Sequence, residues 1–217
     1  MKRGIFICFE GIDGAGKTTQ MLLLKDWLIG KKIEVKVTKA EKRVAGILEM
    51  LVEREIGETN IQPMLYHPWI PSDLRALARA FDHALNGLEV VRPALQEGAI
   101  VMSDRCPYGM LVYQAAFNAR LEWPKKILSV APKPDLAFLL DLEPSTALTR
   151  IRNREHGNLK YYETIEFLTR IRDLFKETQK KMGVFEVIDA SGDVRSINEE
   201  VRAKTLEKLR SVSCQTG

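Results

Sequence analysis

The sequence predicts an α/β fold built on a doubly wound, five-stranded parallel sheet. Three observations carry this prediction. Five short apolar runs recur along the 217 residues, segments with helical periodicity separate them, and a glycine-rich turn joins the first apolar run to the first helical segment. Strands that alternate with helices need right-handed crossovers, and these crossovers place helices on both faces of the sheet.

The apolar runs are predicted to be strands. Most of them are nearly continuous in apolar residues, which is typical of parallel strands covered on both faces. The runs are Ile5–Phe9, Ile33–Val37, Ala99–Ser103, Leu136–Asp141 and Val184–Ile188. Ile33–Val37 alternates between apolar and charged residues, so we expect it at an edge of the sheet.

The segments between the strands are predicted to be helices. Apolar residues recur in them at helical spacing, and Pro144 stands where proline is accepted, in a first helical turn. The predicted helices are Lys17–Ile29, Ser72–Leu95, Pro144–Asn153, Tyr162–Lys181 and Ile197–Leu209. The sequence contains no repeat and no long linker, and we expect residues 1–217 to form a single domain.

Composition is ordinary for a globular protein, with 45% hydrophobic and 29% charged residues. The formal net charge of +4 suits a site that collects phosphates. No Lys/Arg run is dense enough to follow a nucleic acid, so we expect no nucleic-acid partner. The spacing of Cys8, Cys106 and Cys214 fits neither a disulfide framework nor a zinc site.

The sequence shows no sign of a membrane or an export route. No apolar stretch reaches membrane-spanning length. The apolar run at the N-terminus is interrupted by Glu10 and Asp13, and no small-residue cleavage site follows it. We therefore expect a cytoplasmic protein with no membrane partner.

The turn after the first predicted strand carries the pattern G-x-x-x-x-G-K-T, the phosphate-binding P-loop. Its glycines let successive backbone N–H groups point at phosphate oxygens, beside the N-terminus of a helix. Lys17 is predicted to reach the β- and γ-phosphates of ATP, and the Thr18 hydroxyl to bind Mg²⁺. The predicted ATP-binding residues of this loop are Gly11, Gly14, Ala15, Gly16, Lys17, Thr18 and Thr19. A chance match is the alternative, but the strand before the loop and the helix after it favour function.

Asp104 and Arg105 follow the third predicted strand. Ligands of open α/β sheets bind at the carboxyl ends of the strands, where these side chains should lie. Asp104 is therefore a candidate Mg²⁺ ligand, directly or through water, and Arg105 a candidate clamp for an acceptor phosphate. The alternative is a surface ion pair.

Residues 150–163 are predicted to form an arginine-rich lid. Arg150 and Arg154 share one helical face, whereas Arg152 points elsewhere. Phosphoryl transfer needs cations on the transferring group and the exclusion of water. The alternative is a solvated basic helix end.

In order along the chain, these motifs resemble the thymidylate kinase family of P-loop nucleoside monophosphate kinases. The resemblance covers nearly the whole chain. Its motifs are Phe9–Gln20 with Asp13 inside the P-loop, Val91–Leu95, Asp104-Arg105 with Tyr113-Gln114, Pro134–Asp141, Arg150–Glu163 and Val187–Ser191. The resemblance implies Mg²⁺-dependent transfer of the ATP γ-phosphoryl group to a deoxynucleoside monophosphate, and a homodimer formed through the long helices.

The resemblance also implies roles for single residues. Asp13 would face the acceptor sugar and the magnesium shell, Arg105 would hold the acceptor phosphate, and Tyr113 would pack against the sugar. Gly14 and Ala15 stand where some members carry a P-loop arginine, so the lid arginines would supply the cations. The turn that contains Ser191 would lie near the adenine.

The departures from the family cluster at the acceptor base. The segment Thr38–Arg43 replaces the family's Arg-Glu-Pro-Gly-Gly, which leaves Lys39 or Arg43 to substitute. The family's stacking Phe and base-binding Arg become Arg79 and His83, and Phe81 becomes the stacking residue if the alignment slips. Gly109 and Met110 replace polar residues near the base. An unusual insert carries Tyr66, His67 and Trp69, which either shape a different base pocket or fill hydrophobic gaps.

Three functions follow from these patterns. The first is a nucleoside monophosphate kinase, most simply one that converts dTMP to dTDP. The second is phosphorylation of a different nucleotide or nucleoside acceptor on the same scaffold. The third is a non-catalytic nucleotide-binding protein. The base of the acceptor is not determined by the sequence.

Overall fold

The computed structural model describes residues 3–40, 43–48, 50, 70–154 and 163–214. At its centre lies a five-stranded sheet in the order β2-β3-β1-β4-β5. The strands are β1 (Ile5–Glu10), β2 (Val35–Thr38), β3 (Ile100–Asp104), β4 (Leu136–Asp141) and β5 (Glu186–Asp189). Each pairs with its neighbour in parallel. The predicted fold class is confirmed, and β2 lies at an edge as its alternating pattern indicated.

The central strand β1 positions the P-loop. All six of its residues are buried, because β3 and β4 flank it and helices cover it. Phe9 lies beside Asp104 in the register of β1 and β3, so the ends of these two strands lie side by side. The loop that leaves β1 therefore starts next to the Asp104-Arg105 pair.

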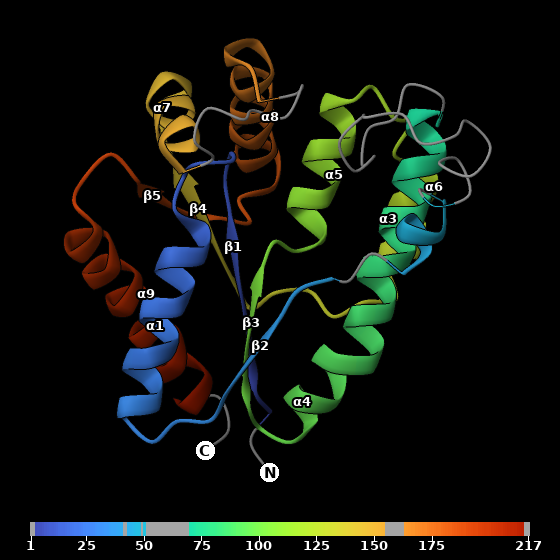
Figure 1. Ribbon diagram of the computed structural model, residues 1–217. Helices are drawn as coiled ribbons and strands as arrows, with labels where there is room; N and C mark the ends of the chain where they lie inside the picture. The colour runs from blue at the N-terminus through green and yellow to red at the C-terminus, as the bar shows by residue number, and fades with distance from the viewer. Residues whose placement is uncertain (1–2, 41–42, 49, 51–69, 155–162, 215–217) are drawn as a thin grey trace.

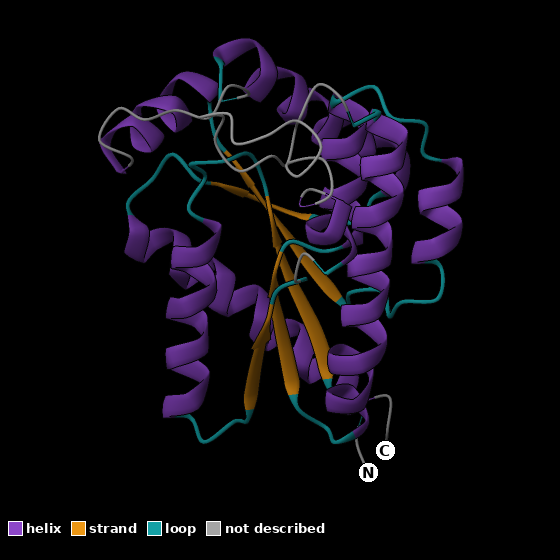
Figure 2. Cartoon of the chain, turned by 45° about the vertical axis from the view of Figure 1, so that its right-hand side comes forward, coloured by secondary structure: helices purple, strands orange, loops and turns teal. Residues whose placement is uncertain are grey.

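Helices cover both faces of the sheet, as Figures 1 and 2 show. On one face α1 (Lys17–Gly30) packs against α9 (Val194–Cys214). Helices of the opposite side are α3 (Ser72–Asn86), α4 (Arg92–Gln96), α5 (Pro107–Ala116) and α6 (Glu122–Leu128). Near the carboxyl ends of the strands, α7 (Pro144–Arg154) packs against α8 (Ile165–Met182), and α8 packs against α5.

The predicted long helix Ser72–Leu95 is interrupted. A π-helical turn, η1 (Gly87–Val91), separates α3 from α4. Pro93 lacks an N–H, and its ring would clash with the carbonyl four residues earlier, so the regular hydrogen-bond ladder cannot continue through it. The turn begins at Gly87, where the chain packs closely, because a Cβ there would lie 2.8 Å from the Cβ of Ala131.

Several helices differ from the predictions. α5 and α6 were not predicted, and residues 44–48 and 50 are also helical. The remaining boundaries agree within a few residues, although the predicted start of α8 at Tyr162 lies outside the described residues. No helix in the described part of the chain combines the length and hydropathy that a membrane-spanning segment requires.

Candidate functional site

The P-loop turns sharply from β1 into α1. Gly11 has a φ of 137° and Gly14 a φ of 83°, a region that favours glycine. Space restricts both positions as well. A Cβ on Gly11 would lie 2.6 Å from the Leu140 carbonyl oxygen, and one on Gly14 would lie 2.5 Å from that of Ala147. The loop therefore packs directly on α7, the helix that carries the lid arginines.

Lys17, the first residue of α1, lies folded back over the loop. Its side chain is 8% exposed, and its Nζ donates to the Ile12 carbonyl at 2.9 Å. The pKa of Lys17 is lowered from 10.5 to about 8, first by burial and then by the Arg105 cation. At neutral pH the ammonium is still mostly charged. It lies 4.0 Å from the Asp13 carboxylate.

The two predicted Mg²⁺ ligands meet at the end of β3. The Thr18 hydroxyl donates to Asp104 Oδ2 at 2.5 Å. Hydroxyl and carboxylate oxygens are hard donors of the kind that Mg²⁺ prefers. Among the described residues, no group of three or more His, Cys, Asp or Glu side chains forms a metal cage.

Arg105 lies at the centre of a hydrogen-bonded group that faces the P-loop. Its Nη2 donates to Asp13 Oδ1 at 2.6 Å and to the Tyr113 hydroxyl at 2.9 Å. Its guanidinium lies 4.1 Å from the centre of the Tyr113 ring. The structure thus brings together the three residues predicted to hold the acceptor sugar and phosphate. Arg105 has a φ of 82°, a conformation that costs a residue other than glycine about 1–2 kcal/mol.

These groups line one open cleft of about 520 Å³. Its walls come from the P-loop, the end of β3, the lid helix α7 and the start of α9. The lining residues are Asp13 to Gln20, Lys39, Asp104, Arg105, Arg150, Arg154, Gly192, Val194 and Ile197. Arg150 also donates to the Ala190 carbonyl at 3.2 Å, which ties α7 to the turn after β5.

Sequence reasoning selected Ser191 in that turn, but three neighbouring residues line the cleft. Ser191 is exposed, and its backbone N–H donates to Asp189. Gly192, Val194 and Ile197 line the cleft instead. Val194 and Ile197 give this wall of the cleft an apolar surface beside Gly192, which suits the face of a base. Their signal in the sequence was weak, because apolar residues at the start of a helix are usually core residues.

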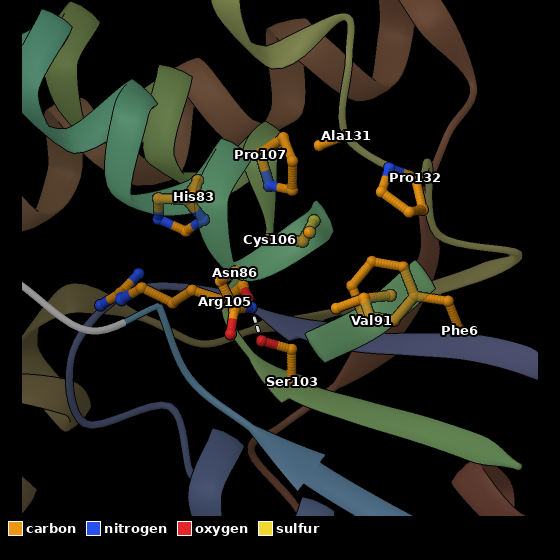
Figure 3. Close-up of a pocket in the computed structure, with 11 residues that line it drawn as sticks. Phe6, His83, Asn86, Val91, Ser103, Arg105, Cys106, Pro107, Ala131 and Pro132 are labelled. Carbon is orange, nitrogen blue, oxygen red and sulfur yellow. Dashed lines mark hydrogen bonds between the residues drawn. The ribbon is translucent and has the colours of Figure 1, made fainter. Parts of the chain in front are cut away.

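The predicted base contacts Arg79 and His83 lie on α3, where Arg79 is ion-paired and His83 is buried. Arg79 forms an ion pair with the buried Asp82, with 3.6 Å between Nη1 and Oδ2. His83 is buried and lines a cavity of about 10 Å³ together with Asn86, Ser103 and Arg105 (Figure 3). That volume holds about one water molecule. The pKa of His83 is lowered to about 3, first by burial and then by the cations of Arg79 and Arg105.

The remaining residues that depart from the family pattern lie partly inside and partly outside the described residues. Gly109 packs against the buried carboxylate of Glu10, and Met110 packs with Ala80 and Leu128. Phe81 is 48% exposed. The insert with Tyr66, His67 and Trp69 lies outside the described residues, as does the lid from residue 155 to 162.

Glu10 is a site residue that sequence reasoning missed. It is completely buried next to Arg105 and Lys17, and burial raises its pKa. The sequence held a signal, since a carboxylate at the end of an otherwise apolar central strand needs a buried partner.

Comparison with known proteins places these features in a family. The family model described as thymidylate kinase matches residues 9–201. A probable thymidylate kinase of Pyrococcus horikoshii is 35% identical over 208 residues, covering 95% of this chain and 98% of the relative. One from Archaeoglobus fulgidus is 35% identical over 211 residues, covering 94% and 96%. One from Pyrobaculum aerophilum is 32% identical over 207 residues, covering 95% and 97%.

Proposed function

Since this chain belongs to the thymidylate kinase family, whose members are phosphotransferases, we propose that it transfers the γ-phosphoryl group of ATP to dTMP and releases ADP and dTDP. One observation supports this most strongly. Asp13 and Arg105 line the same cleft as the rest of the P-loop, and Arg105 also donates to Tyr113, so a donor phosphate and an acceptor phosphate can meet in that cleft.

On the donor side, backbone N–H groups of the P-loop would hold the phosphate chain, and Lys17 would stabilise the charge that develops on the γ-phosphoryl group. Arg150 and Arg154 would approach the same group from α7. Gly192, Val194 and Ile197 would lie against the adenine. The enzyme needs no general base, because the attacking acceptor phosphate oxygen is already ionised at neutral pH.

Thr18 and Asp104 would hold Mg²⁺, with Asp13 close to its water shell. When bound, the ion neutralises charge on the donor phosphates and fixes their geometry. The support for this assignment is the direct contact between the Thr18 hydroxyl and the Asp104 carboxylate.

On the acceptor side, Arg105 would exchange its bond with Asp13 for the acceptor phosphate, and Asp13 would then be available to the sugar. Tyr113 would pack against the sugar. In this reaction the acceptor phosphate oxygen forms the new P–O bond, and the bond between the γ-phosphorus and the bridging oxygen of ADP breaks. Lys39 lines the same cleft and is a further cation that could reach the acceptor.

A different nucleotide acceptor is the second candidate. It is favoured by the setting of α3, where Arg79 is paired with Asp82 and His83 is buried and uncharged. Neither reproduces an aromatic stack combined with a free guanidinium fork.

A coupled ADP-release assay over all common NMPs, dNMPs and their nucleosides tests the proposal. We expect the highest kcat/KM with dTMP and Mg²⁺. Turnover of another monophosphate in its place would support the second candidate. A preference for nucleosides that survives Arg105→Ala would indicate a nucleoside kinase, and ATP binding without transfer to any acceptor would indicate a non-catalytic protein.

Replacing Lys17 tests the donor site. We expect Lys17→Ala to lower kcat by at least about 10²-fold, because it removes charge stabilisation that matters most in the transition state. Lys31→Ala is the matched control, since Lys31 is exposed beyond the end of the same helix. A near-normal rate with Lys17→Ala would mean that the donor site is assigned wrongly.

A further inference from the structure

Glu10 accepts hydrogen bonds from the backbone of the turn after β3 and of the helix that follows it. This carboxylate, at the end of β1, is completely buried. Its Oε1 accepts the backbone N–H of Cys106 at 2.6 Å and that of Gly109 at 3.1 Å. Cys106 is the N-cap of α5 and Gly109 the third residue of that helix, so Glu10 satisfies two N–H groups that the helix itself leaves unpaired.

These hydrogen bonds begin at the residue that follows Arg105. The backbone of Arg105 is held on both sides as well. Its N–H donates to the Phe9 carbonyl at 3.1 Å, and its carbonyl accepts from Ser103 Oγ at 2.6 Å, the bond drawn dashed in Figure 3. A residue with a φ of 82° stays in that conformation only where the surroundings fix it. Phe9, Ser103 and Glu10 together provide this restraint.

The direction of the Arg105 side chain depends on this backbone conformation. From the left-handed position the guanidinium reaches Asp13 at 2.6 Å and the Tyr113 hydroxyl at 2.9 Å. A change of φ to the ordinary negative range would turn the side chain away from both. The restraint on the Arg105 backbone therefore determines whether its side chain faces the cleft.

Gly109 shows how closely the carboxylate is fitted. A Cβ on Gly109 would lie 1.9 Å from Glu10 Oε2 and 2.5 Å from Oε1. Glu10 Oε2 has no hydrogen-bond partner among the described residues. An unpaired, buried carboxylate oxygen is costly. Its presence here is hard to explain by stability alone and points to a role in the site.

We propose that Glu10 is a positioning residue, which holds the turn after β3 so that Arg105 keeps its left-handed backbone and presents its guanidinium to the acceptor phosphate. This inference rests on the proposed function, because it assigns Glu10 a role in the acceptor half of that reaction. Glu10 acts through Arg105 and does not itself touch the substrates.

Two substitutions of Glu10 separate its hydrogen bonds from its charge. Glu10→Ala removes the acceptor of both N–H groups, and we expect the KM for the acceptor to rise or kcat to fall on the order of 10²-fold, the cost of misplacing a positioning group by about 1 Å. The KM for ATP should change little. Glu10→Gln keeps an oxygen in place and should recover most of the activity. If Glu10→Gln is as damaging as Glu10→Ala, or if the KM for ATP rises equally, the proposal is wrong.

Double substitutions test the route through Arg105. In an Arg105→Ala background, Glu10→Ala should cost little more, because the group that it positions is gone. Independent effects that multiply would overturn the proposal. Gly109→Ala displaces the carboxylate, so it should raise the acceptor KM in the wild type and have a smaller effect beside Glu10→Ala, where the added methyl group has room.

Asp135→Asn is the matched control. Asp135 accepts a backbone N–H from the other end of β1, that of Phe6 at 2.9 Å. We expect it to lower stability without changing the acceptor KM. If Asp135→Asn raises the acceptor KM as much as Glu10→Ala, the effect of Glu10 is a general loss of stability.

Crystal structures of the wild type and the Glu10→Ala and Gly109→Ala variants provide a readout that does not depend on turnover. We expect Arg105 to leave its positive φ, or to lose its bond with Asp13, in both variants. An unchanged Arg105 would overturn the proposal even if the enzyme is a kinase. If the wild type phosphorylates no monophosphate, the proposed function fails, whereas these structures still decide whether Glu10 positions Arg105.

Discussion

The protonation state of His83 in the folded protein can be tested through the pH dependence of stability. It is buried between the cations of Arg79 and Arg105, and its pKa is about 3. In the unfolded chain the ordinary value is about 6.5. Between these two values the unfolded state binds more protons than the folded state, so stability is lost as the pH falls below 6.5.

We expect His83→Gln to flatten this part of the stability profile. Between pH 6.5 and pH 5 the wild type should lose about 1.5 kcal/mol of unfolding free energy through His83, and the variant should not. Urea unfolding at several pH values measures the difference. Parallel profiles for the two proteins would show that His83 takes up a proton while folded, as an exposed histidine would.

Sequence spacing locates the candidate residues whose geometry is local. Lys17 and Thr18 belong to one short loop, so their spacing alone brings them together. The positions of Arg79 and His83 relative to the cleft depend on the rotation of α3, and their base contacts stay predictions. Glu10 was missed because its partners, Cys106 and Gly109, lie almost 100 residues away in the sequence.

At the scale of elements, Gly87, the first residue of η1, is closely packed. Gly87→Ala should destabilise the protein by about 1–3 kcal/mol, because the new Cβ would lie 2.8 Å from that of Ala131. Gly30→Ala, at the end of α1, is the matched control. Among the described residues nothing lies within 4 Å of its Cβ, so we expect no loss or a gain of about 0.4–1 kcal/mol. Equal losses in urea unfolding would contradict this explanation.

Two arginines of α7 can be compared to test whether activity depends on a residue that lines the cleft or on the positive charge of the helix in general. Arg150 lines the cleft, whereas Arg152 is exposed on another face of the helix. We expect Arg150→Ala to lower kcat/KM for ATP at least about tenfold, since it removes a cation from the transferring phosphate. Arg152→Ala should leave it nearly unchanged. Steady-state kinetics with varied ATP measures both, and similar losses would place the lid contact elsewhere on α7.

Periodicity predicted the strands and most of the helices, because long apolar patterns dominate their energy. It failed for α5, where Pro107 and Gly109 look like loop residues. Pro107 is accepted there because it occupies the first helical turn, and Gly109 makes room for Glu10, a close approach between elements that periodicity does not reveal.

For the whole molecule, the sequence predicts the parallel sheet but not the strand order, because nothing local says which strands become neighbours. It also leaves the assembly to experiment. Leu74 and Phe81, two turns apart on α3, are 45% and 48% exposed. The two side chains share a helical face, and we propose that this face forms the interface of the homodimer that the family resemblance implies.

We expect sedimentation equilibrium to give the mass of a dimer. Phe81→Glu should shift it toward the monomer, because it places a charge on the proposed interface. Trp123→Glu is the control, since Trp123 is 63% exposed on a different helix, and it should leave the dimer intact. A monomeric wild type, or dissociation by the control alone, would reject α3 as the contact.

The fit between Glu10 and Gly109 also has an evolutionary consequence. A Cβ at position 109 would enter the space of the Glu10 carboxylate, so a side chain cannot be added there while residue 10 and the turn after β3 stay as they are. In a lineage where position 109 acquires a side chain, position 10 must first become shorter, or the turn after β3 must move. Homologous chains that carry a side chain at position 109 should therefore have either a shorter residue at position 10 or a displaced turn after β3, although almost 100 residues separate the two positions.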